Sequence, residues 1–234
     1  MSKGKEFTVA IYAKEYREIC AWVLKNQTLE TGGDLFGLWA DDRTAVIQLV
    51  LGPGENCRRA PHSFYQDVQY LEKVGSDLTG KEALCHIGEW HSHHMIGLTR
   101  PSGGDEGTVW RNMPNYGLNR FILFIANIGS LSPSEVIVGC FLFEFEKGSR
   151  RKLPVLEGSF EFLPDESPFR SKCVSVLRKG AEYMNSDEEI TCLQEVSTDA
   201  AKIAAKRPVM RAKELSQGQR KKKRRCPCPW CTML

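Results

Sequence analysis

The sequence predicts an α/β fold in which one mixed central β-sheet is sandwiched by helices. Short apolar runs of strand length alternate along the chain with segments whose apolar residues recur at helical spacing, and this alternation is typical of a sheet covered by helices. Of the 234 residues, 41% are hydrophobic, which is enough for a sizeable core. No apolar run is long enough to span a bilayer.

The first half of the chain predicts strands and helices in alternation. Apolar residues at helical spacing, such as Tyr16, Ile19 and Val23, indicate helices, and Gly-Gly and Asp-Asp pairs separate the strands. The predicted strands cover residues 7–12, 34–40, 44–51 and 84–91, and the predicted helices cover residues 14–25 and 62–78.

The second half predicts a loop over residues 95–104 and a short helix over 105–113, which places Asp105 near a helix start. We expect paired strands over residues 120–128 and 135–145, and one or two further strands within 152–163. Residues 169–184 are amphipathic and form either a helix packed on the domain or a linker helix. Residues 185–219 are polar with weak periodicity, which is typical of a partly helical or disordered spacer.

His91 and His93 lie one residue apart in a predicted strand, where residues i and i+2 point to the same face. They can therefore offer two imidazoles to one metal ion, and Asp105 can add an oxygen ligand. Two histidines and a carboxylate, with a fourth position left to water, are typical of a catalytic zinc site. The alternative is a strand with surface histidines, and the spacing alone leaves it open.

The motif His91-Ser92-His93, followed by Ser102-x-x-Asp105, resembles the metal motif of the JAMM (MPN+) metalloprotease family. Glu30 opens the sequence Glu-Thr-Gly-Gly-Asp-Leu-Phe-Gly, which resembles the setting of the family's glutamate in its prokaryotic-type JAB branch. The resemblance covers roughly residues 7–170. It departs from the family pattern at His94, where the family usually has proline, and in a loop between His93 and Ser102 that is one residue longer.

The resemblance implies a cytidine-deaminase-like α/β architecture and one Zn²⁺ ion held by His91, His93 and Asp105. It implies that Glu30 accepts the proton of a zinc-activated water and passes it to the leaving amine, and that Ser102 hydrogen-bonds the oxyanion. The implied substrate is a ubiquitin or ubiquitin-like conjugate, cleaved at the bond to a lysine. We expect Glu89, a rival base, to face away from the site.

A second functional class stays open beside the enzyme. Some members of the family are non-catalytic, so the chain could be a catalytically weak or inactive scaffold that binds a partner at membranes. Such members typically lack a metal ligand or the glutamate, and this chain retains Glu30 and all three ligands. The retained residues favour the enzyme.

The charge of the chain is strongly asymmetric. From residue 202 onward there are eleven Lys and Arg and one Glu, a charge of 11 − 1 = +10, so the remainder carries 3 − 10 = −7. The acidic body argues against specific nucleic-acid binding, and the basic tail indicates an electrostatic partner of its own. We expect three parts: a JAMM-like metalloprotease domain (1–165), an accessory helix and linker (166–205) and a lipidated tail (206–234).

The tail predicts attachment to a membrane. Cys231-Thr232-Met233-Leu234 fits the C-a-a-X prenylation signal, and a terminal Leu favours geranylgeranyl. One lipid chain binds membranes only marginally, so we expect palmitoylation at Cys226 or Cys228 and a basic patch facing anionic lipid to assist it. The basic patch consists of Arg220, Lys221, Lys222, Lys223, Arg224 and Arg225.

These features together predict the cytoplasmic face of membranes, in particular the plasma membrane, as the location of the protein. Two alternatives remain. The basic patch could instead be a nuclear localisation signal. The tail cysteines Cys226, Cys228 and Cys231 could instead bind a metal ion, although a fourth ligand is missing.

Overall fold

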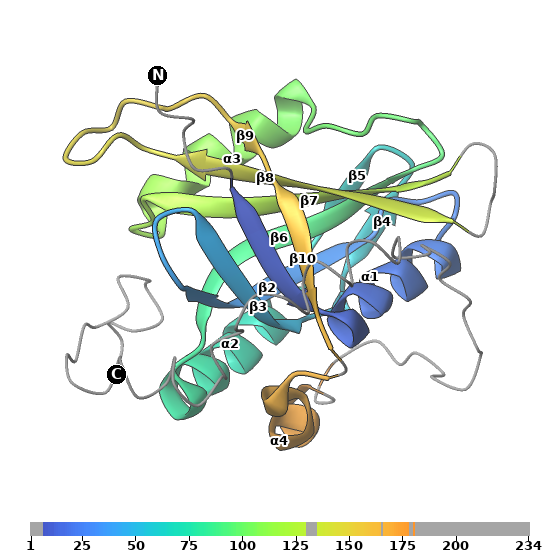
Figure 1. Ribbon diagram of the computed structural model, residues 1–234. Coiled ribbons are helices and arrows are strands. Elements are labelled where there is room, and N and C mark those ends of the chain that lie inside the picture. Colours follow the sequence, from blue (N-terminus) through green and yellow to red (C-terminus); the bar gives the residue numbers. More distant parts are fainter. Residues whose placement is uncertain (1–6, 130–134, 165, 178–179, 181–234) are drawn as a thin grey trace.

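The computed structural model describes residues 7–129, 135–164, 166–177 and 180 (Figure 1). The tail features predicted above, the basic patch of residues 220–225 and the cysteines Cys226, Cys228 and Cys231, lie outside the described residues. Most of the predicted linker and all of the predicted tail do so as well. The predicted division into three parts therefore stays a prediction.

An eight-stranded mixed sheet forms the centre of the described part, in the order β10-β1-β3-β2-β6-β7-β8-β9 (Figure 1). A separate hairpin pairs β4 (Arg58–Ala60) with β5 (Ser63–Tyr65). The sheet strands are β1 (Thr8–Tyr12), β2 (Gly32–Trp39), β3 (Thr44–Val50), β6 (Cys85–His94), β7 (Arg120–Ile128), β8 (Val136–Glu144), β9 (Leu156–Glu157) and β10 (Ser159–Leu163). Strand β6 lies in the middle, antiparallel to β2 and parallel to β7.

Helices cover both faces of the sheet. They are α1 (Ala13–Lys25), α2 (Val68–Glu82), α3 (Gly103–Asn115) and α4 (Pro168–Leu177). In β7, Ile122 and Phe124 join the core under α1, whereas Leu123 and Ile125 join the core under α3. Because alternate residues of a strand face opposite ways, α1 and α3 lie on opposite faces. The predicted α/β fold with a mixed sheet between helices is confirmed.

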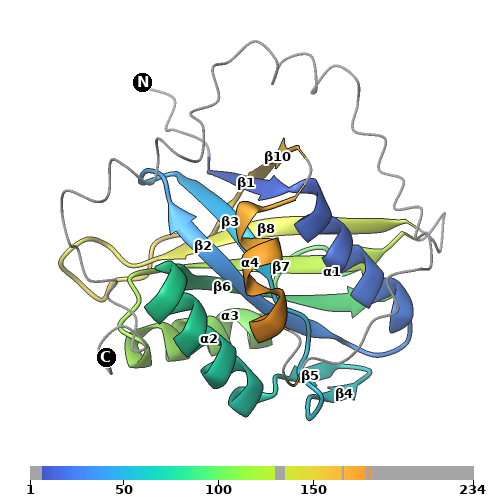
Figure 2. The ribbon, with the colours of Figure 1, turned by 90° about the horizontal axis from the view of Figure 1, so that it is seen from below.

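Helix α4 packs on the rest of the domain, beside α2 (Figure 2). Its Cys173 and Leu177 are buried, and the Tyr70 hydroxyl of α2 donates to the Leu177 carbonyl at 3.2 Å. Arg170 donates from Nε to Oε1 of the fully buried Glu15 at 2.9 Å. Of the two arrangements open for residues 169–184, the described part shows the packed one. No helix in the described part of the chain is long and apolar enough to cross a membrane.

Two predicted elements differ from the structure at their boundaries. The helix predicted from residue 62 starts instead at Val68, because the Asp67 carboxylate accepts the Tyr70 N–H at 3.1 Å and so caps the first turn. The residues before it form the β4–β5 hairpin. The strand predicted over residues 84–91 continues to His94, so both histidines of the motif lie inside β6.

Candidate metal centre

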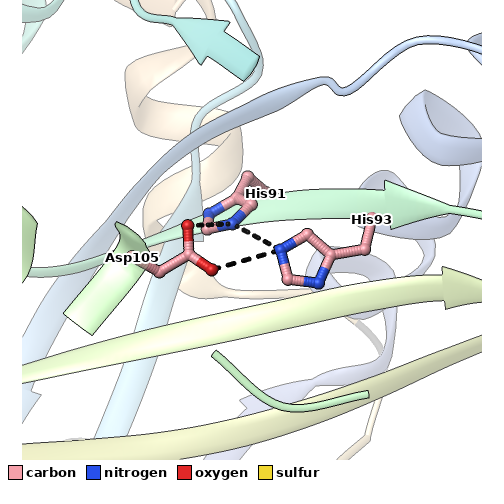
Figure 3. Close-up of side chains that lie close together, drawn as sticks. All are labelled: His91, His93 and Asp105. Atoms are coloured by element: carbon pink, nitrogen blue, oxygen red, sulfur yellow. Dashed lines mark hydrogen bonds and ion pairs between the residues drawn. The ribbon is translucent and has the colours of Figure 1, made fainter. Parts of the chain in front are cut away.

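Strand β6 presents His91 and His93 on the face of the sheet that α3 covers. Trp90, which precedes them, is 1% exposed and belongs to the core under α1, and Ser92, which separates them, is fully buried. Strand alternation therefore directs the two imidazoles to the opposite face. Helix α3 begins on that face and brings Asp105 to them from its first turn, so three side chains from two elements meet at one point (Figure 3).

The three side chains are spaced as ligands of one small cation. His91 Nε2 lies 3.2 Å from His93 Nε2 and 3.3 Å from Asp105 Oδ1, and His93 Nε2 lies 3.3 Å from Asp105 Oδ2 (Figure 3). Ligand atoms about 2.0–2.1 Å from a tetrahedral zinc ion are about 3.3–3.4 Å from one another. The His91–His93–Asp105 triad is thus compatible with one metal ion.

His93 is oriented by a backbone carbonyl. Its Nδ1 donates to the Leu98 carbonyl at 2.8 Å, which leaves Nε2 directed at Asp105. Metal-binding histidines usually hold their second ring nitrogen in this way. Burial would lower the pKa of His93, but the hydrogen bonds to Asp105 and Leu98 outweigh it, and the pKa lies above its ordinary value.

Ser102 and Asp105 form a capping box at the start of α3. The Asp105 N–H donates to Ser102 Oγ at 3.2 Å, and the Ser102 N–H donates to Asp105 Oδ2 at 2.6 Å. Burial would raise the pKa of Asp105, but hydrogen bonds with His91 and His93 outweigh it and hold the pKa well below its usual range. Asp105 is thus an oriented carboxylate at neutral pH, and the Ser102 hydroxyl lies beside it.

Glu30 lies two residues before the first β2–β6 pair, which joins Gly32 to His91. Ser92 N–H donates to the Thr31 carbonyl at 2.8 Å, and Thr31 N–H donates to Ser92 Oγ at 3.0 Å, so Glu30 follows opposite His93. Its side chain is buried. Burial raises the pKa of Glu30, and the charges of His91 and His93 partly offset this. A buried carboxyl with a raised pKa beside the triad can accept a proton near neutral pH.

The Gly32-Gly33 pair allows β2 to approach this closely. A Cβ on Gly33 would lie 1.9 Å from the Leu51 carbonyl oxygen, which also accepts the Trp90 indole N–H at 2.9 Å. A Cβ on Gly32 would lie 2.5 Å from the Trp90 carbonyl oxygen. Only residues without a side chain fit at positions 32 and 33.

Near the triad, the structure corrects the expected orientation of Glu89 and adds Asn127, which sequence reasoning did not identify. Glu89 shares the face of His91, so the expectation that it faces away is wrong; burial raises its pKa, and the charge of His91 opposes this. Asn127 in β7 is buried and donates from Nδ2 to the same Leu98 carbonyl, at 3.1 Å. The contact of Asn127 with Leu98 has no sequence signal, because any residue can supply a carbonyl.

Comparisons with known proteins agree with this description at a coarse level. No protein-family model matches the chain. The chain is 26% identical over 140 residues to a protein of Enterobacter hormaechei subsp. hoffmannii (strain UCI 50) named CD-NTase/cGAS isopeptidase. The aligned residues cover 59% of this chain and 71% of that protein. The solution structure of protein DSY2949 from Desulfitobacterium hafniense matches with a TM-score of 0.50 and 19% identity, over 68% of this chain and 94% of that one. The second likeness shows the fold alone.

Proposed function

We propose that this chain is a zinc-dependent isopeptidase of the JAMM type that hydrolyses ubiquitin or ubiquitin-like conjugates. The observation that carries the proposal is the meeting of His91, His93 and Asp105 at one point, with the buried Glu30 beside them. The similarity to a protein named CD-NTase/cGAS isopeptidase supports the reaction class. That name also makes conjugates of CD-NTase-like proteins substrates to test.

The triad suits zinc by the chemistry of its donors. Two neutral imidazoles and one carboxylate form the donor set of catalytic zinc sites that leave a fourth position open. The spacing of 3.2–3.3 Å between donor atoms and the carbonyl that holds His93 support the same assignment. A zinc ion bound there would lower the pKa of a water molecule toward neutrality and polarise the scissile carbonyl.

The residues of the chain supply the proton transfers and the positioning. Glu30, with its raised pKa, accepts the proton of the attacking water and delivers it to the leaving lysine amine. Ser102 donates its hydroxyl proton to the oxygen of the attacked carbonyl, while the same Oγ accepts the Asp105 N–H. The capping box thereby holds one metal ligand and one oxyanion donor in a fixed relation.

The proposal extends to the location of the reaction. An acidic body and a tail that ends in a C-a-a-X sequence after six consecutive basic residues support hydrolysis at a membrane surface. In this proposal Cys231 carries the prenyl group and the basic patch contacts anionic lipid. Replacement of Cys231 by Ser is expected to move the protein from the membrane fraction to the soluble fraction. A Cys231→Ser protein that stays fully membrane-bound contradicts this part of the proposal and leaves the chemistry untouched.

The competing function is a non-catalytic scaffold. This function predicts that the protein binds conjugates or partners but does not cleave them, whether or not it holds a metal ion. The retention of Glu30 beside a complete triad favours the enzyme. The test is to purify the full chain, measure its zinc content, and offer isopeptide-linked conjugates of ubiquitin, ubiquitin-like proteins and a CD-NTase. Stoichiometric zinc and cleavage at the lysine bond support the enzyme, whereas a zinc-loaded protein inert toward the whole panel supports the scaffold.

A further inference from the structure

The Leu98 carbonyl accepts two hydrogen bonds from buried side chains on neighbouring strands. His93 Nδ1 of β6 donates to it at 2.8 Å, and Asn127 Nδ2 of β7 donates to it at 3.1 Å. His93 and Asn127 are 4% and 3% exposed. Leu98 itself belongs to the loop between β6 and α3, and its side chain is exposed, so its backbone rather than its side chain joins the two strands.

The strand register places Asn127 on the face of the triad. Ile125 of β7 pairs with His91, and His94 pairs with Asn127 after a register shift in β6. Ala126 joins the core under α1, so Asn127, like Ile125, faces the side that α3 covers. The amide is thereby directed at the loop that runs from the two histidines to Ser102.

The buried amide of Asn127 lowers the stability of the fold. Its Oδ1 is buried and has no hydrogen-bond partner among the described residues. An unsatisfied buried polar atom costs about 1–3 kcal/mol, and an apolar side chain of the same shape would avoid this cost. Buried polar groups that persist in this state are often explained by a role at a site. The donation to Leu98 supplies such a role here.

We propose that Asn127 is a positioning residue for the metal centre, because it fixes the Leu98 carbonyl that holds His93 in the Nδ1–H tautomer. The loop after β6 otherwise carries exposed apolar side chains at Met95, Ile96 and Leu98. The hydrogen bond from Asn127 holds the Leu98 carbonyl in place, and the His93 Nε2 lone pair then points at the position between His91 and Asp105. Loss of a group that orients a metal-binding histidine typically costs 10–100-fold in metal affinity.

The inference rests on the proposed metal centre but does not need the proposed reaction, so its test uses zinc alone. Asn127→Leu removes the N–H donor and the unpaired Oδ1 while keeping the approximate shape of the side chain. The zinc dissociation constant of the full chain is measured by competition with a chromophoric chelator, and the free energy of unfolding of the metal-free chain by urea denaturation. The expected result is zinc affinity roughly 10–100-fold weaker in a chain that is as stable as the wild type.

A matched control separates positioning from general loss of stability. Gln48 is another buried amide side chain, 4% exposed, whose Oε1 accepts the Ser167 hydroxyl at 2.9 Å between β3 and the segment before α4. Gln48→Leu is expected to lower the free energy of unfolding and to leave zinc affinity unchanged. If Asn127→Leu does not fold, Asn127→Asp serves instead, because it has nearly the same size and no N–H to donate to Leu98.

A second readout follows the histidine itself. In the zinc-loaded chain, the Nδ1–H proton of His93 that donates to Leu98 is expected to exchange slowly with solvent in the wild type and faster in Asn127→Leu, as measured by NMR. A folded Asn127 variant with wild-type zinc affinity and unchanged exchange of this proton overturns the inference. If Asn127→Leu weakens zinc binding but the zinc-loaded wild type cleaves no conjugate, the proposed function fails and the positioning role stands.

Discussion

His94 Nε2 donates to the Pro61 carbonyl at 2.7 Å, and this bond joins the end of β6 to the turn of the β4–β5 hairpin. The neighbouring Ala60 carbonyl accepts the Glu30 N–H at 3.0 Å. His94 therefore secures the hairpin whose backbone holds the proposed general base. The residue has a φ of 37°, a left-handed conformation that proline, fixed near −65°, cannot adopt. Proline, which is usual at this position in the family that the metal motif resembles, would therefore not fit the backbone at residue 94.

Replacement of His94 by Ala is expected to loosen the hairpin without removing zinc. The lost hydrogen bond contributes about 0.5–1.5 kcal/mol, so amides of residues 58–65 should exchange with solvent about 2–10-fold faster. Hydrogen-exchange mass spectrometry measures this, and His62→Ala, an exposed histidine of the same hairpin, is the control. Unchanged exchange in His94→Ala contradicts the anchoring role. His94→Pro should be more disruptive than His94→Ala, because it also forces the backbone away from φ 37°.

A methyl group at Gly33 is expected to destabilise the whole domain. The Cβ would lie 1.9 Å from the Leu51 carbonyl oxygen, a backbone atom that cannot move without breaking the β2–β3 pairing. We expect Gly33→Ala to lower the free energy of unfolding by about 3 kcal/mol or more. The control is Gly107→Ala in α3, where a Cβ would meet nothing within 4 Å. That change should stabilise the helix by about 0.5–1 kcal/mol, and urea denaturation should show opposite signs for the two variants.

Asp67 should make stability depend on pH in the acid range. Burial would raise the pKa of its carboxyl, but N–H groups of Asn56 and Tyr70 donate to it and hold the pKa below its ordinary 3.8. The stabilisation by the Asp67 carboxylate is therefore fully present at pH values above its ordinary pKa. It is lost as the pH falls through the lower pKa of the folded chain. Asp67→Ala should cost about 0.5–2 kcal/mol at pH 7, and the difference from the wild type should shrink at about pH 3.

Denaturation at both pH values measures this dependence, with the exposed Asp42→Ala as a control that should change little at either pH. An Asp67→Ala deficit that is equally large at both pH values would show that the carboxylate charge is not the cause.

Ser102 is expected to affect stability and rate together. Ser102→Ala removes the acceptor for the Asp105 N–H, which should cost about 1 kcal/mol as a lost helix cap. It also removes the proposed oxyanion donor, which should lower the rate of conjugate cleavage on the order of 10²-fold. Ser102→Thr retains the hydroxyl and should therefore keep most of the stability and most of the cleavage rate. If Ser102→Ala loses stability but not rate, Ser102 is a cap only.

The sequence predicts the main sheet-forming segments and the positions of the three triad residues, whereas their assignment to one metal ion rests on the resemblance to a known family. Strands β7 and β8 were predicted because long apolar runs with a turn between them have no competing interpretation. His91 and His93 were placed on one face because strand alternation is independent of tertiary context, and the predicted helix start brought Asp105 into reach. Glu30 required the resemblance to a known family, since an isolated glutamate after a helix has no distinctive signal.

The features that sequence reasoning missed depend on contacts between distant segments. Strand β5 falls within the helix predicted over residues 62–78, because Phe64, Val68 and Leu71 have helical spacing, but the cap at Asp67 begins the helix only at Val68. The orientation of Glu89 is a local matter instead: Trp90 faces the core under α1, so strand alternation directs Glu89 to the other face, with His91. The Leu98 carbonyl and the His94–Pro61 bond involve backbone acceptors, which no residue type reveals.

The most direct test of the proposed mechanism compares Glu30→Gln with His91→Ala in zinc content and in cleavage of an isopeptide-linked conjugate by the full chain. Glu30 is assigned to the proton and His91 to the metal. The account predicts that Glu30→Gln retains one zinc ion per chain and loses roughly 10²–10⁴-fold in rate, whereas His91→Ala loses zinc and activity together. A Glu30→Gln protein that cleaves the conjugate at the wild-type rate would contradict the account.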